Sequence, residues 1–367
     1  MLLTLIKNFR VINKSIKSVL IVDEVGSECI KYCIPDFTSY VVIPTRNIIP
    51  VVLSINFFAR LVVRIIRKDG IRLSVLYSII DVLEPKVIIS FIDNAPKMGK
   101  IQSTFPDKLV ISVQNGLRTK LHKFPASVPC LYGFGYYEKL LLSDIGSSIK
   151  EYKAVGSLRF GIFFEKQNAM VINKYDVCYI SQFSYHSDAF SVHLERKYFD
   201  RLINICQENK YSLSVALRFS VNSTGYSLEL EHFHKLDLNN YAVYVHNNAR
   251  EFSSYALGLS SSVIASFSST LAYELFGAGK KVLFLGSGSQ ELIKHHGTED
   301  IFSRMPDEVR LDNLSEKCIK NKLSELMVMS ETKYLSAIRD AQMYYMNSKK
   351  GHPHKIIKKR ISDFIEI

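Results

Sequence analysis

The sequence predicts an α/β fold made of two Rossmann-like domains that face each other across a cleft. Short apolar runs alternate with helical patterns along the chain, which is typical of parallel sheets covered by helices. The alternation occurs in two successive series, within residues 1–160 and 175–345, and 367 residues fit two domains of ordinary size. Polar turns follow several apolar runs, at the edge where open parallel sheets bind ligands.

The first series begins at residue 18 and supplies the predicted N-terminal domain. Its expected strands are 18–23, 40–43, 86–92 and 109–113, with weaker ones at 128–134 and 152–155, and its clearest helices are 56–68 and 72–83. Asp93 and Asn94 follow the third of these strands. Gln114, Asn115, Gly116 and Arg118 follow the fourth, so all these polar residues are expected at one edge of the sheet.

The second series supplies the predicted C-terminal domain, after a boundary near residues 160–174. Its expected strands are 176–180, 212–217, 241–245, 263–265 and 282–285, and its expected helices are 193–209, 252–257 and several from 316 onward. Ser181 and Gln182 follow the first strand, and Arg218 follows the second. We expect residues 346–367 to form a C-terminal helix that crosses back to the first domain.

Residues 262–286 carry the most informative pattern. Ser268, Ser269 and Thr270 form a hydroxyl cluster between an apolar run and a helical pattern, where Ser and Thr commonly cap helices. Backbone N–H groups and the positive end of the helix dipole at such a turn suit a phosphate or pyrophosphate. Glu274, one turn further on, is placed to accept hydrogen bonds from a ribose. An ordinary capped helix is the alternative interpretation.

Two further residues are candidates for catalysis. Asp93 ends a buried strand, and a carboxylate there could deprotonate an acceptor hydroxyl, although capping the next helix is the alternative. The guanidinium of Arg218 could offset charge on a departing diphosphate, although a surface arginine is the alternative. Histidines and carboxylates near residues 295–300 fit no standard metal spacing, so no metal site is predicted.

The amino-acid composition and the N-terminal sequence indicate in which compartment the protein resides and which kinds of partner it binds. Hydrophobic residues make up 47% of the chain, and no apolar run is long enough to span a membrane. Lys and Arg interrupt the N-terminal apolar stretch and no small-residue cleavage site follows, so we expect no signal peptide, a cytoplasmic protein and six reduced cysteines. The net charge of +12 favours a polyanionic partner. Nucleic acid is disfavoured because the basic residues are spread over both halves.

Two basic segments suggest an anionic membrane surface as one such partner. One is the predicted helix 56–68, and the other is the basic, amphipathic tail 352–364. In the helix, the cations are Arg60, Arg64 and Arg67, and they lie beside Phe57, Phe58 and Ile65. For the helix, a core position with a solvated basic edge is the alternative.

Several of these segments together carry a family resemblance. They are VLIVDEVGSE (19–28), VIPTR (42–46), KVIISFIDN (86–94), VISVQNGLR (110–118), VGSLR (155–159), DVCYISQF (176–183) and SSTLAYELFGAGKKVLFL (268–285). In this order, they resemble bacterial surface carbohydrate biosynthesis proteins, for polysaccharide and lipopolysaccharide, which are glycosyltransferases of GT-B type. Relatives often have a QHG-like element where this chain has Gln114, Asn115 and Gly116.

The resemblance implies transfer of a sugar from a nucleotide-sugar donor to a growing surface polysaccharide or lipid-linked glycan. It implies no cofactor beyond this co-substrate and no metal, and it allows peripheral attachment to the inner face of the cell membrane. Residues on the donor side would be Ser181, Gln182, Ser268, Ser269, Thr270 and Glu274; those on the acceptor side or in the cleft would be Asn94, Gln114, Asn115, Gly116 and Arg118. A polyol-phosphate transferase and a nucleotide-sugar epimerase of the same architecture are the alternatives.

Overall fold

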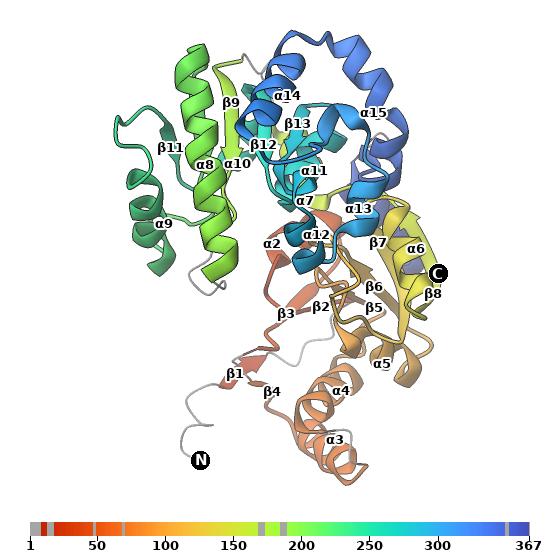
Figure 1. Cartoon of the computed structure of the whole chain (residues 1–367). Coiled ribbons are helices and arrows are strands. Elements are labelled where there is room, and N and C mark those ends of the chain that lie inside the picture. The colour runs from red at the N-terminus through yellow and green to blue at the C-terminus, as the bar shows by residue number, and fades with distance from the viewer. Residues whose placement is uncertain are drawn as a thin grey trace. The chain divides into compact units, whose positions relative to one another are not determined.

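The computed structural model describes residues 9–12, 18–46, 49–67, 70–167, 173–183, 189–348 and 352–366. It divides into two compact units. Unit 1 comprises the described residues within 1–116, 122–162 and 350–367, and unit 2 those within 117–121 and 163–349. Each unit is a parallel sheet covered by helices (Figure 1), so the predicted α/β class with two Rossmann-like domains is confirmed.

Unit 1 contains a six-stranded parallel sheet in the order β3-β2-β5-β6-β7-β8. Its strands are β2 (Val19–Val22), β3 (Tyr40–Ile43), β5 (Val87–Ser90), β6 (Leu109–Val113), β7 (Ser127–Gly133) and β8 (Ser148–Ala154). Residues of β2, β5 and β6 are buried throughout, because helices cover both faces of a parallel sheet. A separate pair, β1 (Phe9–Ile12) and β4 (Ile49–Val52), was not predicted; Pro50 lies within it, as is usual only at sheet edges.

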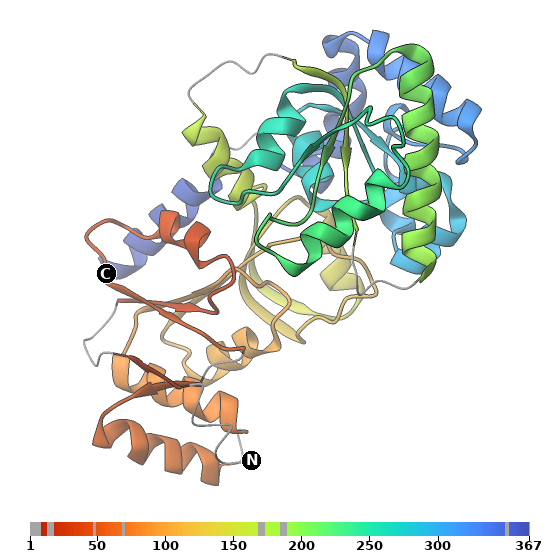
Figure 2. The same ribbon diagram turned by 90° about the vertical axis from the view of Figure 1, so that its left-hand side faces the viewer.

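The helices of unit 1 are arranged around its sheet. They are α2 (Ser27–Ile30), the 3₁₀ helix η1 (Lys31–Cys33), α3 (Ile55–Ile66), α4 (Ile71–Leu83), α5 (Pro96–Thr104), α6 (Tyr137–Asp144) and α16 (Pro353–Ile365); the division between the units falls within α7 (Leu158–Lys166). Buried residues of α4 and α5 share one apolar cluster with Leu20, Ile88 and Val110 of the central strands. In Figures 1 and 2, α4 lies between α3 and the sheet.

The C-terminal helix α16 is part of unit 1. It packs against η1 and β5, and its Ile357 and Ile361 are fully buried. Lys358 and Arg360 pair with Asp36 at 3.0 Å and Glu151 at 3.2 Å. The apolar side of the basic tail is therefore used inside the protein, which corrects the expectation that it lies on a membrane.

Unit 2 contains a five-stranded parallel sheet in the order β11-β10-β9-β12-β13. Its strands are β9 (Tyr175–Ile180), β10 (Leu213–Ala216), β11 (Val243–Val245), β12 (Ser261–Ser266) and β13 (Lys281–Phe284). Counted along the chain, this is the Rossmann order 3-2-1-4-5, whose direction reverses between β9 and β12. A ligand site is expected outside the carboxyl ends of these two strands.

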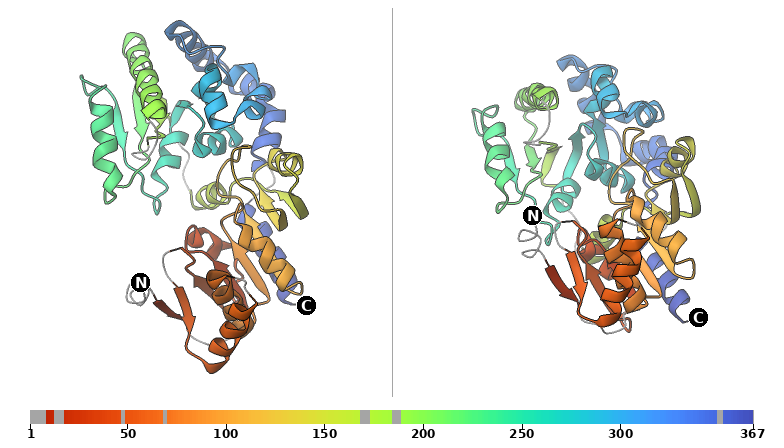
Figure 3. Two further views of the ribbon diagram at one scale, coloured as in Figure 1. Left: turned by 60° about the horizontal axis from the view of Figure 1, so that its bottom comes forward. Right: turned by 90° about the horizontal axis from the view of Figure 1, so that it is seen from below.

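The helices of unit 2 form a layer on each face of its sheet (Figures 2 and 3). They are α8 (Ala189–Asn209), α9 (Thr224–His234), α10 (Ser253–Leu259), α11 (Thr270–Gly277), α12 (Gln290–His296), α13 (Glu299–Ser303), α14 (Glu316–Val328) and α15 (Glu331–Tyr345), with 3₁₀ helices η2 (Leu285–Gly288) and η3 (Asp307–Val309). The pair α8 and α14 covers one face, and α10 and α11 cover the other, with α15 packed on α11.

Three other expectations concern strand ends, membrane spans and cysteines. The predicted strand 86–92 is shorter than expected, because β5 ends at Ser90, whose hydroxyl accepts the Ile92 N–H at 3.2 Å and starts a turn. Within the described residues, no helix combines the length and hydropathy needed to cross a bilayer. All six cysteines are free thiols and five are buried, as predicted.

Candidate functional site

In unit 2, the polar residues that follow β9 and β12 meet across the point where strand order reverses. The side-chain oxygen of Gln182, after β9, accepts the backbone N–H of Ser268, after β12, at 2.7 Å. Gln182 is held in turn, because its own N–H donates to the carboxylate of Glu195 on α8 at 2.8 Å. Gln182 and Ser268, both expected on the donor side from the sequence, are therefore in contact in the structure, and Glu195 supports them through a bond that the sequence did not predict.

A second buried carboxylate, Glu229 on α9, organises the ends of β9 and β10. It accepts the Ser181 hydroxyl at 2.5 Å and the backbone N–H groups of Arg218 at 2.9 Å and Phe219 at 3.0 Å. Its side chain is fully buried. These bonds satisfy amides just beyond the end of the strand and fix the backbone from which the Arg218 side chain projects.

Burial shifts the proton affinity of both carboxylates. It raises the pKa of Glu195 to about 7, against hydrogen bonds from Gln182 and Tyr179 that favour the charged form. Burial also raises the pKa of Glu229, against the same kind of bonds from Arg218, Ser181 and Phe219. Both groups are enclosed by their own unit, so the geometry makes them supports for the loops rather than groups that meet a substrate.

Arg218 is the exposed cation of this edge. One guanidinium N–H donates to the Phe183 carbonyl at 3.2 Å, and the guanidinium lies over the Phe219 ring, 5.7 Å from its centroid. Among the described residues, no carboxylate is within salt-bridge distance of it. A guanidinium that is held at a strand end and forms no salt bridge suits an anionic ligand.

The hydroxyl cluster begins α11 as predicted. Ser269 is the residue before the helix, and neither its hydroxyl nor that of Ser268 is hydrogen-bonded within the described residues. Thr270, the first helical residue, accepts the N–H of Leu117 at 3.1 Å. That contact lies within unit 2, because residues 117–121 belong to it, and Lys120 also pairs there with Asp300 at 2.6 Å.

Glu274 lies on the inner side of α11. Only 4% of it is exposed, and it accepts the Tyr255 hydroxyl from α10 at 2.6 Å. Tyr255 stacks in turn on Phe163, with ring centroids 5.3 Å apart. This bond joins α10 to α11. A ribose hydroxyl that contacts Glu274 would therefore have to bind the same carboxylate as the Tyr255 hydroxyl or replace that hydroxyl.

The corresponding edge of unit 1 is organised around Gln114 and Glu138. Gln114 donates to the Glu138 carboxylate at 2.6 Å and to the Gly116 carbonyl at 3.0 Å, and it accepts the Phe134 N–H at 2.7 Å. Burial raises the pKa of Glu138 to about 7, against bonds from Gln114 and Gly135, and the charge of Asp93 adds to the rise. Gln114, predicted to face the acceptor, thus uses its amide to shape its own loop.

The other predicted residues of unit 1 lie at the same edge. Asp93 is 5% exposed and lies in the turn after β5, and Asn94 beside it is half-buried. After β6, Asn115 and Gly116 are half-buried. Arg118, beyond the loop, is 9% exposed and belongs to unit 2.

Asp23 at the carboxyl end of β2 forms a charge cluster that the sequence did not single out. Its carboxylate accepts from Thr45 and Arg46, each at 3.1 Å, and lies 3.6 Å from the Lys97 ammonium. Burial alone would raise the pKa of Asp23, but hydrogen bonds from Val25, Arg46 and Thr45 and the Lys97 charge lower it overall. This cluster lies where strand order reverses in unit 1, between β2 and β5, and its two cations, Arg46 and Lys97, share the single carboxylate of Asp23.

A shared signal could have revealed the three buried glutamates. Each lies on the apolar stripe of its helix: Glu138 precedes Leu141 and Leu142, Glu195 precedes Phe199, and Glu229 precedes Phe233, and all four apolar residues are buried. A carboxylate on an apolar stripe must find hydrogen-bond donors inside the fold. In this protein, the donors are the loops at the carboxyl ends of the strands.

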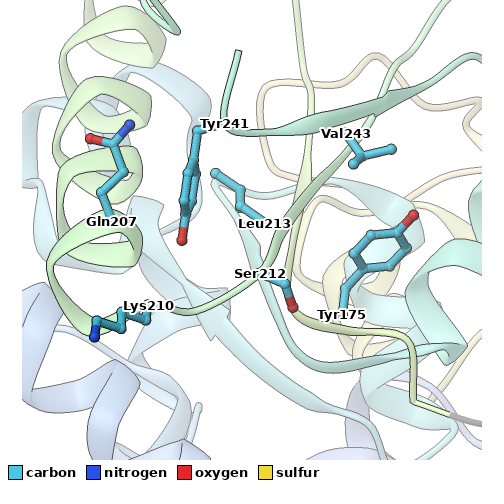
Figure 4. Close-up of a pocket in the computed structure, with 7 residues that line it drawn as sticks. All are labelled: Tyr175, Gln207, Lys210, Ser212, Leu213, Tyr241 and Val243. Atoms are coloured by element: carbon cyan, nitrogen blue, oxygen red, sulfur yellow. The ribbon is translucent and has the colours of Figure 1, made fainter. Parts of the chain in front are cut away.

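A cavity of about 400 Å³ lies at the opposite edge of the unit 2 sheet (Figure 4). Its walls come from the amino ends of β9, β10 and β11 and from the end of α8, and the lining residues are Tyr175, Gln207, Lys210, Ser212, Leu213, Tyr241 and Val243. None of the predicted donor residues lines it. Open α/β sheets bind ligands at the carboxyl edge, so this cavity is not the candidate site.

Comparison with known proteins places the fold. No protein-family model and no curated protein sequence matches the chain. Solved structures do: the UDP-GlcNAc 2-epimerase from Neisseria meningitidis bound to UDP-GlcNAc has a TM-score of 0.54 and 13% identity, over 95% of this chain and 99% of that one. The S. aureus MnaA–UDP structure has the same score and identity over 96% of each chain.

A second kind of protein shares the same architecture. A variant of the wall teichoic acid polymerase TagF has a TM-score of 0.56 and 12% identity, over 95% of this chain and 89% of that one. Similarity at this level of identity concerns the fold and extends over nearly the whole chain. The protein therefore has the GT-B fold of two Rossmann-like domains, which these epimerases and this polymerase share.

Proposed function

We propose that the protein is a glycosyltransferase that binds a nucleotide-sugar donor at the carboxyl edge of the unit 2 sheet. The observation that carries the proposal is the arrangement at the strand-order reversal, where Gln182 accepts the backbone N–H of Ser268 and so holds the turn before α11, while the Ser268 and Ser269 hydroxyls form no hydrogen bond within the described residues. The first N–H groups of a helix lack intrahelical partners, and its dipole favours an anion there. A nucleoside diphosphate offers the matching charge and oxygens.

The remaining donor-side roles follow from this placement. Arg218 would contact the diphosphate and stabilise the charge that it gains as it leaves. Thr270 would position the start of α11, while Ser181 acts through Glu229 on the backbone of Arg218. Glu274 remains the proposed ribose contact, provided that it shares its bond with Tyr255.

The proposed transfer uses a base and a leaving group. The acceptor hydroxyl gives its proton to a carboxylate, for which we propose Asp93, and its oxygen bonds to the anomeric carbon of the sugar. The bond from that carbon to the phosphate oxygen breaks, and its electron pair leaves with the nucleoside diphosphate. A surface polysaccharide or lipid-linked glycan is the proposed acceptor, with Asn94, Asn115 and Gly116 on its side and Gln114 shaping the loop.

Epimerisation of a nucleotide sugar is the second candidate, because solved epimerases share this fold over the whole chain. The two reactions differ in what happens to the nucleotide. A transferase releases the nucleoside diphosphate only as sugar reaches an acceptor, whereas an epimerase returns the nucleotide with the sugar inverted at one carbon. Product analysis with and without a glycan acceptor separates them.

The donor site is tested by calorimetric titration with UDP, CDP, GDP and CMP. We expect at least one nucleotide to bind the parent protein and to raise its melting temperature. Gln182→Ala should weaken that binding about tenfold, because the Ser268 backbone loses its support. Gln207→Ala is the matched control, since Gln207 lines the cavity at the opposite edge and should leave binding unchanged. Failure of every nucleotide to bind, or equal losses in both variants, would contradict the proposal.

A further inference from the structure

Helix α3 of unit 1 presents its most apolar face outward. Four of its residues at helical spacing are largely exposed: Ile55 (88%), Phe58 (50%), Val62 (56%) and Ile66 (73%). Ile65, which lies beside Phe58 around the helix, is 47% exposed. We call these five residues the outer face of α3. Contiguous exposed apolar surface of this kind usually marks an interaction site.

The opposite side of α3 is already used within unit 1. Phe57 is fully buried, and Arg64 points toward α4, where its guanidinium meets the Asp81 carboxylate at 3.1 Å. The same guanidinium lies over the rings of Tyr77 at 5.2 Å and Phe105 at 5.5 Å. This corrects two sequence expectations: Arg64 is not part of an outward cationic stripe, and α3 is not a core helix with its apolar side inside.

Positive charge flanks the outer face. Arg60 and Arg67 are exposed and lie about a third of a turn around the helix from Ile66, on one side of the outer face, and Arg72 is exposed at the start of α4. Among the described residues of α3 and α4, the sole acidic side chain is Asp81, which Arg64 neutralises. Exposed apolar residues continue onto the adjoining segments at Leu53 and Ile71. The surface is thus apolar in the middle and cationic at its border.

We propose that the outer face of α3 inserts into the interfacial layer of an anionic lipid membrane, with Arg60, Arg67 and Arg72 on the headgroups. A helix with an apolar face and flanking cations lies in the plane of such an interface, with its apolar side at the acyl boundary. Each cation near an anionic surface strengthens the attachment, which therefore weakens as salt screens it. The inference concerns unit 1 alone and does not rest on the proposed nucleotide site of unit 2.

Charge argues for lipid rather than a second copy of the chain. A two-fold interface would place the outer face of α3 against its own copy. The arginines at its border would then meet like charges, with Asp81 already occupied by Arg64. Anionic headgroups supply negative charge, which the described residues of α3 and α4 offer only at Asp81, already paired with Arg64.

Vesicle flotation tests the proposal with the full chain. The probes are vesicles of phosphatidylcholine alone and of phosphatidylcholine mixed with phosphatidylglycerol. We expect the protein to float with the mixed vesicles, to bind the neutral ones more weakly, and to be released by salt. Val62→Glu should lower partition onto the mixed vesicles about tenfold. The substitution replaces an exposed apolar side chain, which would be buried in the lipid, by a charged one. Arg60→Gln and Arg67→Gln should each lower it about fivefold.

Matched substitutions far from α3 in the sequence test whether an effect on vesicle binding is specific to the outer face of α3. Val328, at the end of α14, is 86% exposed, and Arg250 is exposed as well, so Val328→Glu and Arg250→Gln should leave partition unchanged. Melting temperatures and sedimentation velocity of every variant accompany the flotation. Equal effects of Val62→Glu and Val328→Glu, absence of the parent protein from all vesicles, or a large drop in melting temperature for Val62→Glu would overturn the proposal. So would a concentration-dependent dimer that Val62→Glu abolishes.

Discussion

The two units have the same kind of sheet, but the charged residues at the carboxyl edges of the two sheets have different partners. In unit 1, the charges at this edge are paired with one another: Asp23 with Arg46 and Lys97. In unit 2, the buried carboxylates Glu195 and Glu229 bind backbone N–H groups, and the cation Arg218 forms no salt bridge among the described residues, although its charge acts on both carboxylates. Both cations of the unit 1 cluster are engaged by the Asp23 carboxylate, whereas the Arg218 guanidinium, at the end of β10, forms no salt bridge within the described residues and suits a phosphate. This contrast supports the proposal that the anionic part of a ligand binds to unit 2.

The largest expected effect comes from removing the carboxylate that organises unit 2. Glu229→Ala leaves the Ser181 hydroxyl and the Arg218 and Phe219 amides without their acceptor, so we expect the free energy of unfolding to fall by about 3 kcal/mol. Urea unfolding measures this. Glu231→Ala on the same helix is the control, because Glu231 is exposed and pairs only with Lys235. Similar losses in the two variants would show that the bonds of Glu229 do not hold the edge.

The pH dependence of stability tests the buried carboxylate of unit 1. The pKa of Glu138 is raised to about 7 in the folded protein from its ordinary 4.5, so the folded state holds this proton more tightly. Its contribution to stability is complete below about pH 4.5, falls as pH rises toward about 7, and is constant above that. Glu138→Gln removes this dependence and keeps an oxygen for Gln114.

The difference in free energy of unfolding between the Glu138→Gln variant and the parent protein should therefore shift in favour of the variant by on the order of 2 kcal/mol from about pH 5 to about pH 8. Urea unfolding at the two pH values gives the difference. Glu195→Gln should behave in the same way in unit 2, because burial raises the pKa of Glu195 to about 7 as well. Parallel pH profiles for parent and variants would mean that these carboxylates are already charged in the folded state.

Substituting one arginine in each unit tests whether the carboxyl edges of the two sheets differ in nucleotide binding. Arg218→Gln removes the unit 2 cation that forms no salt bridge among the described residues and should weaken nucleoside diphosphate binding by about 1.5 kcal/mol. Arg46→Gln removes a cation of unit 1 that is bound to the Asp23 carboxylate and should leave that binding unchanged. Calorimetric titration of both variants measures the difference. A larger loss for Arg46→Gln would reverse the assignment of the two edges.

The smallest expected effect concerns the start of α11. Thr270→Ala leaves the Leu117 N–H without its acceptor and should lower the free energy of unfolding by about 1 kcal/mol. Thr270→Ser keeps the hydroxyl and should recover most of that loss. Thermal unfolding of the two variants gives the comparison, and an equal loss in both would assign the effect to the threonine methyl group instead of the hydrogen bond.

The sequence by itself determined the fold class and much of the strand order along the chain. Apolar runs such as 109–113 and 176–180 form β6 and β9, because a strand covered on both faces must be apolar throughout. It also placed Ser268, Ser269 and Thr270 at the start of α11, since hydroxyl residues before an apolar helical pattern favour a cap. Local chemistry decided these features, and local chemistry is visible in a sequence.

Tertiary structure decided what each polar side chain binds and which helix faces are covered. Glu229 contacts Ser181, 48 positions away, and Gln182 contacts Ser268, 86 positions away, so no local pattern contains these pairs. Glu274 turned inward to Tyr255 because α10 packs on α11. In α3, the periodicity showed an apolar face, but only the packing of Phe57 and Arg64 on α4 determined that this face points outward. Hydrogen bonds and burial depend on distant neighbours, and the fold alone supplies those neighbours.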